Sequence, residues 1–270
     1  MSKNLTITTL VDNSLYDKRL SSEFGYSLLI TYGKENIMFD TGYSNLFLQN
    51  AKKLAIDLNI VNTVVISHRH KSHSGGVPHL VRILKNKTSF IIEPLYFQKF
   101  SKNIDGKIDY GYIDYIDSIK QYLKRHELTT IRKDVYNYKE NIYFFLPSDT
   151  LEHKYPLNKF NIRNALAMII DTKKGLFIFL GAAHSRFSMV LDWVSERFPD
   201  KKIEMVFGGI NVNFKRDRDI EIIKKSIQKA KINHFELSHC SSEREYYFLK
   251  ELVGSIYFNG AGKVLAFNDL

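Results

Sequence analysis

Three histidines stand within six residues of one another in the segment SHRHKSHSGG. His68, His70 and His73 follow an apolar run that has the composition of a buried strand. Neutral imidazoles gathered at one loop can converge on a metal ion, and in an extended loop His68 and His70 project to the same side. The adjacent Gly75 and Gly76 let the backbone turn sharply and approach whatever the histidines hold. The segment therefore predicts a metal site.

Other candidate residues stand at the ends of predicted strands. His184 and His239 occupy strand-to-helix junctions, where α/β folds gather their sites. Asp40, in the segment FDTG, could accept the second N–H of a histidine ligand and fix its tautomer, or it could be an ordinary turn or helix-capping residue. Cys240 is a soft ligand, a reactive thiol or a small buried residue. We interpret the remaining histidines as surface or core residues: His79, His126, His153 and His234.

Strands and helices that could position these residues alternate in two rounds. Apolar alternation and β-branched residues predict strands over 5–11, 26–32, 36–39, 63–66, 89–92, 165–170, 176–180, 203–207 and 263–267. Helical spacing predicts helices over 44–54, 78–84, 188–198, 217–230 and 243–252, with Ser44 as a helix cap. The pattern favours an α/β fold in which two mixed sheets pack face to face with helices outside. We expect a single domain over 1–270, with an aromatic, polar insertion or lid at about 97–159 in which 113–123 could be helical.

The composition excludes several classes of protein. The chain has 270 residues, 44% of them hydrophobic and 25% charged, which is typical of a globular protein. Its net charge of +10 is dispersed, and even the densest basic cluster, around Lys215 and Arg216, is mixed with acidic residues, so we expect no nucleic-acid partner. One cysteine allows no intrachain disulfide. Without a signal peptide or a long apolar stretch, we expect a cytoplasmic protein with no membrane contact and leave its oligomeric state open.

Taken in order, these segments resemble the metallo-beta-lactamase fold superfamily. The H-x-H-x-x-H cluster, the upstream FDTG and the downstream strand-end histidines carry the resemblance. It is strongest to a branch of small metal-dependent hydrolases that includes the dihydropterin ribofuranosyl-aminobenzene phosphate synthases. The matching segments are Leu10–Asn13, Glu23–Ile30, Met38–Gly42, Asn50–Leu54, Val64–Gly76, Leu180–His184, Gly208–Gly209 and Ser238–Cys240.

The resemblance implies a four-layer αββα sandwich and a set of metal ligands. It implies that His68, His70 and His184 hold a first metal, and that His73 and His239 belong to a second. Zinc is the expected metal, with manganese or iron as alternatives. His73 and its neighbour Ser72 are the catalytic candidates.

This chain departs from the family pattern at four positions. The substitutions are Ser72 for the aspartate of H-x-H-x-D-H, Ala182 for the cysteine of GCSH, Asn211 for the histidine of GGFHL and Phe24 for the histidine of EHG. A dinuclear zinc site carries four positive charges, which are costly to bury without carboxylates. We therefore expect one metal, because three histidines suffice for a single zinc with an open place for water.

Two functions remain open from the sequence. The first is a metal-dependent hydrolase-like protein that acts on a small phosphorylated or ester-like substrate through a metal-bound water, with Asn211, Lys215 and Arg216 as possible substrate contacts. The alternative is a catalytically degenerate member that binds a small ligand or a partner protein, since a serine hydroxyl such as that of Ser72 cannot act as a base at neutral pH. A nuclease is disfavoured because no basic stripe interleaved with aromatic residues is present.

Overall fold

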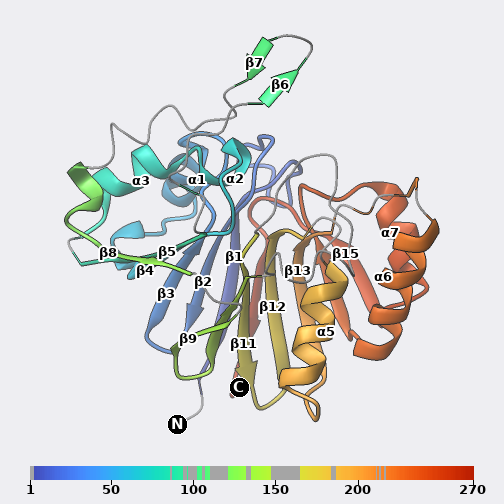
Figure 1. Ribbon diagram of the computed structural model, residues 1–270. Helices are drawn as coiled ribbons and strands as arrows, with labels where there is room; N and C mark the ends of the chain where they lie inside the picture. The colour runs from blue at the N-terminus through green and yellow to red at the C-terminus, as the bar shows by residue number, and fades with distance from the viewer. Residues whose placement is uncertain are drawn as a thin grey trace. The chain divides into compact units, whose positions relative to one another are not determined.

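The chain forms two compact units, each built on its own sheet (Figure 1). Unit 1 comprises Lys3–Thr130 and Gly260–Asn268, and unit 2 comprises Ile131–Asn259. The computed structural model describes residues 3–85, 87–93, 96, 102–104, 107–109, 121–131, 135–146, 165–183, 187–210, 212, 214–215 and 217–270. Among the helices of these residues, none is long and apolar enough to cross a membrane.

The sheet of unit 1 has seven strands in the order β16-β1-β2-β3-β4-β5-β8. Their bounds are Leu5–Val11 (β1), Ser27–Tyr32 (β2), Glu35–Phe39 (β3), Thr63–Ile66 (β4), Ser89–Ile92 (β5), Glu127–Thr130 (β8) and Val264–Phe267 (β16). The sheet is antiparallel from β16 to β3 and parallel from β3 to β8. A separate hairpin joins β6 (Lys102–Ile104) to β7 (Lys107–Asp109).

Helices cover one face of this sheet. They are α1 (Leu46–Lys53), the 3₁₀ helix η1 (Leu58–Ile60), α2 (Lys71–Ser74) and α3 (Val77–Ile83). Val64 and Ile66 of β4 pack in one apolar cluster with Phe47 of α1 and Leu80 of α3. The short strands β4 and β5 are buried at almost every residue and so on both faces, which is consistent with their almost entirely apolar sequences.

The sheet of unit 2 also has seven strands, in the order β15-β14-β13-β12-β11-β10-β9. The bounds are Val135–Lys139 (β9), Ile142–Phe145 (β10), Ala167–Thr172 (β11), Gly175–Ala182 (β12), Ile203–Gly209 (β13), His234–Leu237 (β14) and Ser255–Phe258 (β15). Strands β12 to β15 are parallel and β9 to β12 are antiparallel. The helices are α5 (Phe187–Arg197), α6 (Asp217–Ala230) and α7 (Glu243–Lys250).

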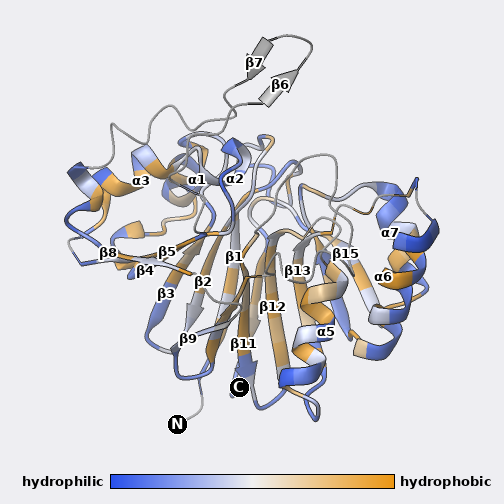
Figure 2. Cartoon of the chain, in the orientation of Figure 1, coloured by the Kyte–Doolittle hydropathy of each residue, from blue (hydrophilic) through white to orange (hydrophobic). Residues whose placement is uncertain are grey.

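The core of unit 2 lies between these helices and one face of the sheet. Ile178, Val206 and Phe235 of the sheet cluster with Leu191 of α5 and Ile227 of α6. Figure 2 shows the corresponding hydropathy, with apolar central strands and an α6 that is polar along one side and apolar along the other. Apolar residues at helical spacing therefore place α6 on the sheet.

The α/β class with two mixed sheets is confirmed, and α6 has the predicted bounds. The N-cap residue of α1 is Asn45 and not Ser44, although the Ser44 hydroxyl accepts a hydrogen bond from the Leu46 N–H at 3.1 Å. Strands β8, β9 and β10 lie within the predicted insertion at about 97–159 and extend the two sheets, and the insertion itself stays a prediction. Most of 113–123 lies outside the described residues. The single-domain assignment stays a prediction.

Candidate metal centre

The carboxyl ends of the parallel strands β3 and β4 bring Asp40 beside Ser67. Phe39 pairs with Val65 in the sheet, and the Asp40 N–H continues the ladder by donating to the Val65 carbonyl at 2.8 Å. Asp40 itself has a φ of 57°, a left-handed conformation that aspartate tolerates better than most residues. Both side chains are buried. The chain thus leaves the sheet at Asp40 with its carboxyl group turned toward the segment that follows β4.

The Asp40 carboxylate accepts three hydrogen bonds. Oδ1 accepts the Ser67 N–H at 2.8 Å, and Oδ2 accepts the Ser67 hydroxyl at 2.7 Å. Nδ1 of His73 lies 2.7 Å from the same Oδ2 and must carry the proton, because a carboxylate only accepts. The Ser67 hydroxyl has given its hydrogen to Asp40, so its 2.9 Å contact with Nδ1 of His68 requires a proton on that nitrogen too.

One buried carboxylate therefore sets the tautomers of two histidines. His73 and His68 each carry their proton on Nδ1, the first through a direct bond and the second through Ser67. In both rings Nε2 is the nitrogen that presents a lone pair. An imidazole oriented by a carboxylate in this way is the usual form of a metal-ligating histidine.

The three imidazoles of the histidine cluster lie against one another. The ring centroid of His68 is 4.1 Å from that of His73 and 4.7 Å from that of His70. Partial burial of the His70 ring, with a smaller contribution from the charge of Arg69, lowers the pKa of His70 to about 4. His70 is therefore neutral at physiological pH, which is the form that can bind a metal.

Burial raises the pKa of the Asp40 carboxyl well above its usual range, and the two hydrogen bonds from Ser67 oppose that effect. A carboxylate in this environment depends on its donors to stay ionised. The Ser67 hydroxyl therefore supports both the charge of Asp40 and the orientation of His68. No sequence motif gives Ser67 a role, although its place between the strand and the first histidine could have suggested one.

The glycine pair acts through close packing and not through a sharp turn. Gly75 and Gly76 have ordinary right-handed helical conformations. A Cβ on Gly75 would lie 2.1 Å from the Tyr43 carbonyl oxygen, and one on Gly76 would lie 2.4 Å from the Thr41 carbonyl oxygen. The Thr41 N–H donates to the His73 carbonyl at 2.7 Å. The missing side chains let the histidine segment lie directly on the backbone that follows Asp40.

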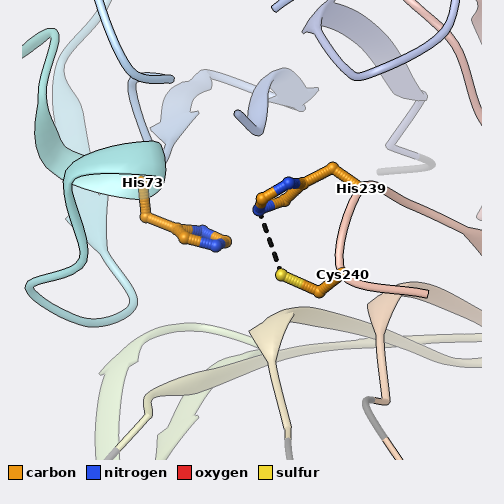
Figure 3. Close-up of side chains that lie close together, drawn as sticks. All are labelled: His73, His239 and Cys240. Atoms are coloured by element: carbon orange, nitrogen blue, oxygen red, sulfur yellow. Dashed lines mark hydrogen bonds between the residues drawn. The ribbon is translucent and has the colours of Figure 1, made fainter. Parts of the chain in front are cut away.

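In unit 2, His239 and Cys240 lie in the turn between β14 and α7. They sit at the carboxyl end of β14, beside the ends of the parallel strands β12 and β13. Nε2 of His239 is 3.0 Å from the Cys240 sulfur, the dashed line in Figure 3. A Cβ on Gly209 would lie 2.3 Å from the Cβ of Cys240, so this packing requires glycine there.

The other predicted site residues have varied positions. Ser72 is buried in α2, and its carbonyl accepts the Tyr26 N–H at 3.0 Å. Phe24 is 66% exposed, and Ala182 is buried at the end of β12. Lys215 follows β13 in the chain. His153, His184, Asn211 and Arg216 lie outside the described residues.

Within unit 1 the structure thus brings together His68, His70, His73 and Asp40. Unit 1 also contains a buried acid to which no sequence motif points. Glu93 comes directly after β5, the strand that pairs with β4, and is 2% exposed. A lone glutamate at a strand end gives no sequence signal of its own, whereas its position at the same sheet edge as Ser67 follows from the parallel register.

Comparisons with known proteins agree with this fold. The metallo-beta-lactamase superfamily pattern matches residues 22–97. The 7,8-dihydropterin-6-methyl-4-(beta-D-ribofuranosyl)-aminobenzene-5'-phosphate synthase of Methanocaldococcus jannaschii is 24% identical, over 98% of this chain and 97% of the relative.

Two solved structures extend the comparison. A metal-dependent hydrolase of the beta-lactamase superfamily, Tm1679, has a TM-score of 0.78 and 26% identity, over 98% of this chain and all of the other. YhfI of Bacillus subtilis, a metallo-beta-lactamase fold protein, has a TM-score of 0.63 at 10% identity over 98% of this chain and all of the other, which is a likeness of fold alone. The superfamily pattern thus covers the histidine segment, and the chain is similar over nearly its whole length to a metal-dependent hydrolase of the beta-lactamase superfamily.

Proposed function

We propose that this protein is a metal-dependent hydrolase with a single metal, acting on a small phosphorylated or ester-like substrate. The observation that carries the proposal is the hydrogen-bonded group in which Asp40 orients His73 directly and His68 through Ser67. A histidine that served only to fill the core would not need its tautomer fixed by a buried carboxylate. The name of the structural relative, a metal-dependent hydrolase, supports the same class of reaction.

The donor set fits one borderline divalent metal. His68 and His73 present Nε2, and His70 is neutral, so unit 1 offers three imidazole donors. Imidazole nitrogen suits zinc well and also suits iron, whereas manganese prefers oxygen donors. His184 and His239 stay assigned to the site by the family resemblance. When bound, such a metal polarises a substrate oxygen and makes water a stronger acid.

The chain's own residues define what surrounds the donors. Asp40 and Ser67 hold two rings in the metal-binding tautomer before any metal arrives, and a preoriented donor loses less entropy on binding. Ser72, at the position of the family aspartate, supplies neither a charge nor a base. One divalent charge is therefore easier to accommodate than two in a region whose ligands are neutral.

Lys71 is the candidate for substrate binding that the structure adds. It stands between His70 and Ser72, it is exposed, and its Nζ lies 4.6 Å from the centre of the Tyr43 ring. Phe24 is also exposed, and the glycine after it packs against the Tyr43 backbone. A lysine on an aromatic ring beside the donors suits a phosphate or another anionic substrate. The curated relative named as a synthase of an aminobenzene phosphate is in keeping with that substrate class.

The second candidate function is ligand binding without turnover. Ser72 favours it, because the residue that would activate water in the family pattern is a buried hydroxyl here. Such a protein would retain the scaffold and bind the substrate-like molecule but would not hydrolyse it.

Metal analysis combined with an activity assay separates the two functions. We expect purified protein reconstituted with zinc to hold one equivalent and to hydrolyse bis(4-nitrophenyl) phosphate or a simple lactone. The variant pair His68→Ala and His70→Ala should lose both properties, while His79→Ala, a half-buried histidine of α3, should keep them. One bound metal without turnover of any substrate would favour the binding function, and no bound metal would refute the proposal.

A further inference from the structure

A second group of reactive side chains lies in unit 2, at the opposite end of β14 from His239. His234 and Ser255 are the first residues of the parallel strands β14 and β15, and they pair directly in the sheet. Glu236 lies two residues along β14 and so shares a face with His234. β15 is the edge strand of the sheet, so Ser255 lies at its margin.

These three side chains form a continuous hydrogen-bonded chain. The Ser255 hydroxyl lies 2.7 Å from Nδ1 of His234, and Nε2 of the same ring lies 2.8 Å from Oε1 of Glu236. An ionised Glu236 accepts the Nε2 proton, which leaves a lone pair on Nδ1 to receive the hydroxyl hydrogen. A second hydroxyl contact, to the Asn233 carbonyl, is much longer at 3.4 Å. The arrangement is serine to imidazole to carboxylate.

The surroundings hold this group in place, and the burial falls from Glu236 toward Ser255. Glu236 is 1% exposed, whereas the His234 side chain is 17% exposed and Ser255 is half-buried. The Tyr257 ring stacks on the imidazole with centroids 5.2 Å apart at 26°. The Ser255 N–H is bound to the Asn233 carbonyl at 2.9 Å, which sets the start of β15. The carboxylate is thus buried, the imidazole is held by the Tyr257 ring, and Ser255 is half-buried at the start of the edge strand.

We propose that Ser255 is a nucleophilic serine that accepts acyl groups from small activated esters. His234 removes the hydroxyl proton as Oγ forms a bond to the ester carbonyl carbon, and Glu236 positions the ring and stabilises its positive charge. The bond from that carbon to the leaving oxygen then breaks, and the proton passes from His234 to the leaving oxygen. Water, deprotonated by His234, later cleaves the acyl–serine bond and regenerates the hydroxyl. No metal or other reactant enters these steps.

Labelling with a fluorophosphonate probe tests the proposal. The probe forms a P–O bond with an activated serine and loses fluoride, and peptide mass spectrometry identifies the serine. We expect labelling at Ser255, with at least a 100-fold lower rate in His234→Ala, since a general base contributes about 10²- to 10⁴-fold. Ser255→Ala should abolish labelling, and Ser195→Ala, a half-buried serine of α5, should leave it unchanged. A burst of 4-nitrophenol from 4-nitrophenyl acetate should follow the same pattern.

Glu236→Gln separates positioning from a role in folding. The amide keeps the size of the side chain, so the variant should fold, as circular dichroism would show, yet label at least 10-fold more slowly. In ¹⁵N NMR, His234 should be the Nε2–H tautomer in the native protein and lose that preference in Glu236→Gln.

The outcome is independent of the metal centre. Labelling should persist in His68→Ala and in the presence of a chelator, so failure of the proposed hydrolase would leave this result unaffected. The proposal would be overturned if the folded native protein were not labelled at Ser255, or if His234→Ala were labelled at the same rate. The three side chains would then only hold the edge strand in place.

Discussion

The exchange of Asp40 for asparagine should weaken metal binding strongly while leaving the apoprotein stable. Asparagine keeps the shape of the side chain, and its Oδ1 can still accept the Ser67 N–H. The amide N–H₂ then occupies the place of Oδ2, which accepts from His73 and from Ser67 in the native protein. A donor therefore replaces an acceptor at two contacts.

The apoprotein can adapt by reversing the proton positions. His73 can accept at Nδ1 and keep its proton on Nε2, and Ser67 can accept from the amide and donate to His68. All three contacts survive, and no charge is buried, so we expect the stability to change by less than about 1.5 kcal/mol. However, both rings now carry their proton on Nε2, the nitrogen that the metal needs.

To bind a metal, His68 and His73 of the variant must move their protons from Nε2 back to Nδ1. The introduced amide opposes this move, because it donates a hydrogen bond where Asp40 accepts one. With one hydrogen bond to a charged group worth about 1.5–3 kcal/mol, two lost contacts cost about 3 kcal/mol or more. At about 1.4 kcal/mol per factor of ten, zinc affinity should fall at least ~100-fold. This loss lies at the upper end of the ~10- to 100-fold effect of removing a partner of a metal-ligating histidine.

Zinc titration against a competing chelator would measure the affinity, and ¹⁵N NMR of labelled histidines would report the tautomers. Asp57→Asn is the control, because Asp57 is an exposed cap of η1 in the same unit. A folded Asp40→Asn protein that binds zinc within about threefold of the native affinity would refute the reasoning, as would Nδ1–H tautomers in the variant.

Three further changes test other parts of the structure. Asn50→Ala removes the hydrogen bonds that the Asn50 amide donates to the Leu10 and Ser21 carbonyls at 2.8 Å. Urea titration should show a free energy of unfolding lower by about 2–4 kcal/mol, whereas Gln49→Ala, at an exposed position, should leave it nearly unchanged. Gly76→Ala places a Cβ 2.4 Å from the Thr41 oxygen, so stability should fall by about 2 kcal/mol or more; an unchanged urea midpoint would contradict this packing. Ser72→Asp restores the family carboxylate, so elemental analysis should find a second metal ion per chain. An unchanged metal content would show that another feature limits the number of metals.

The sequence predicts most of the framework because its main elements have strong local patterns. The apolar spacing of α6 reflects burial of a single face, and the apolar run of β4 reflects burial of every residue, so both patterns can be recognised locally. β9 is different, since its sequence VYNYK is polar and aromatic, and only pairing with β10 reveals it as a strand. β15 was not predicted for a similar reason, because Tyr257 and Phe258 of this edge strand are exposed.

The histidines of the candidate site are visible in the sequence, but their supporting contacts are not. The cluster from His68 to His73 is conspicuous because its members are neighbours. Asp40 is 33 positions from His73, so the sequence left its role as a tautomer-fixing residue and its role as a turn residue equally open. Ser67 is an ordinary residue type whose function depends on lying between two other side chains. Such contacts come from the parallel register of β3 and β4, which no local pattern encodes.

The zinc stoichiometry of the native chain tests the central claim most directly. Elemental analysis of protein dialysed against trace zinc should find one metal per chain, lost in the His68→Ala and His70→Ala variants and retained in His79→Ala. A metal content of zero or two, or one that is unaffected by loss of His68 and His70, would contradict the single site proposed here.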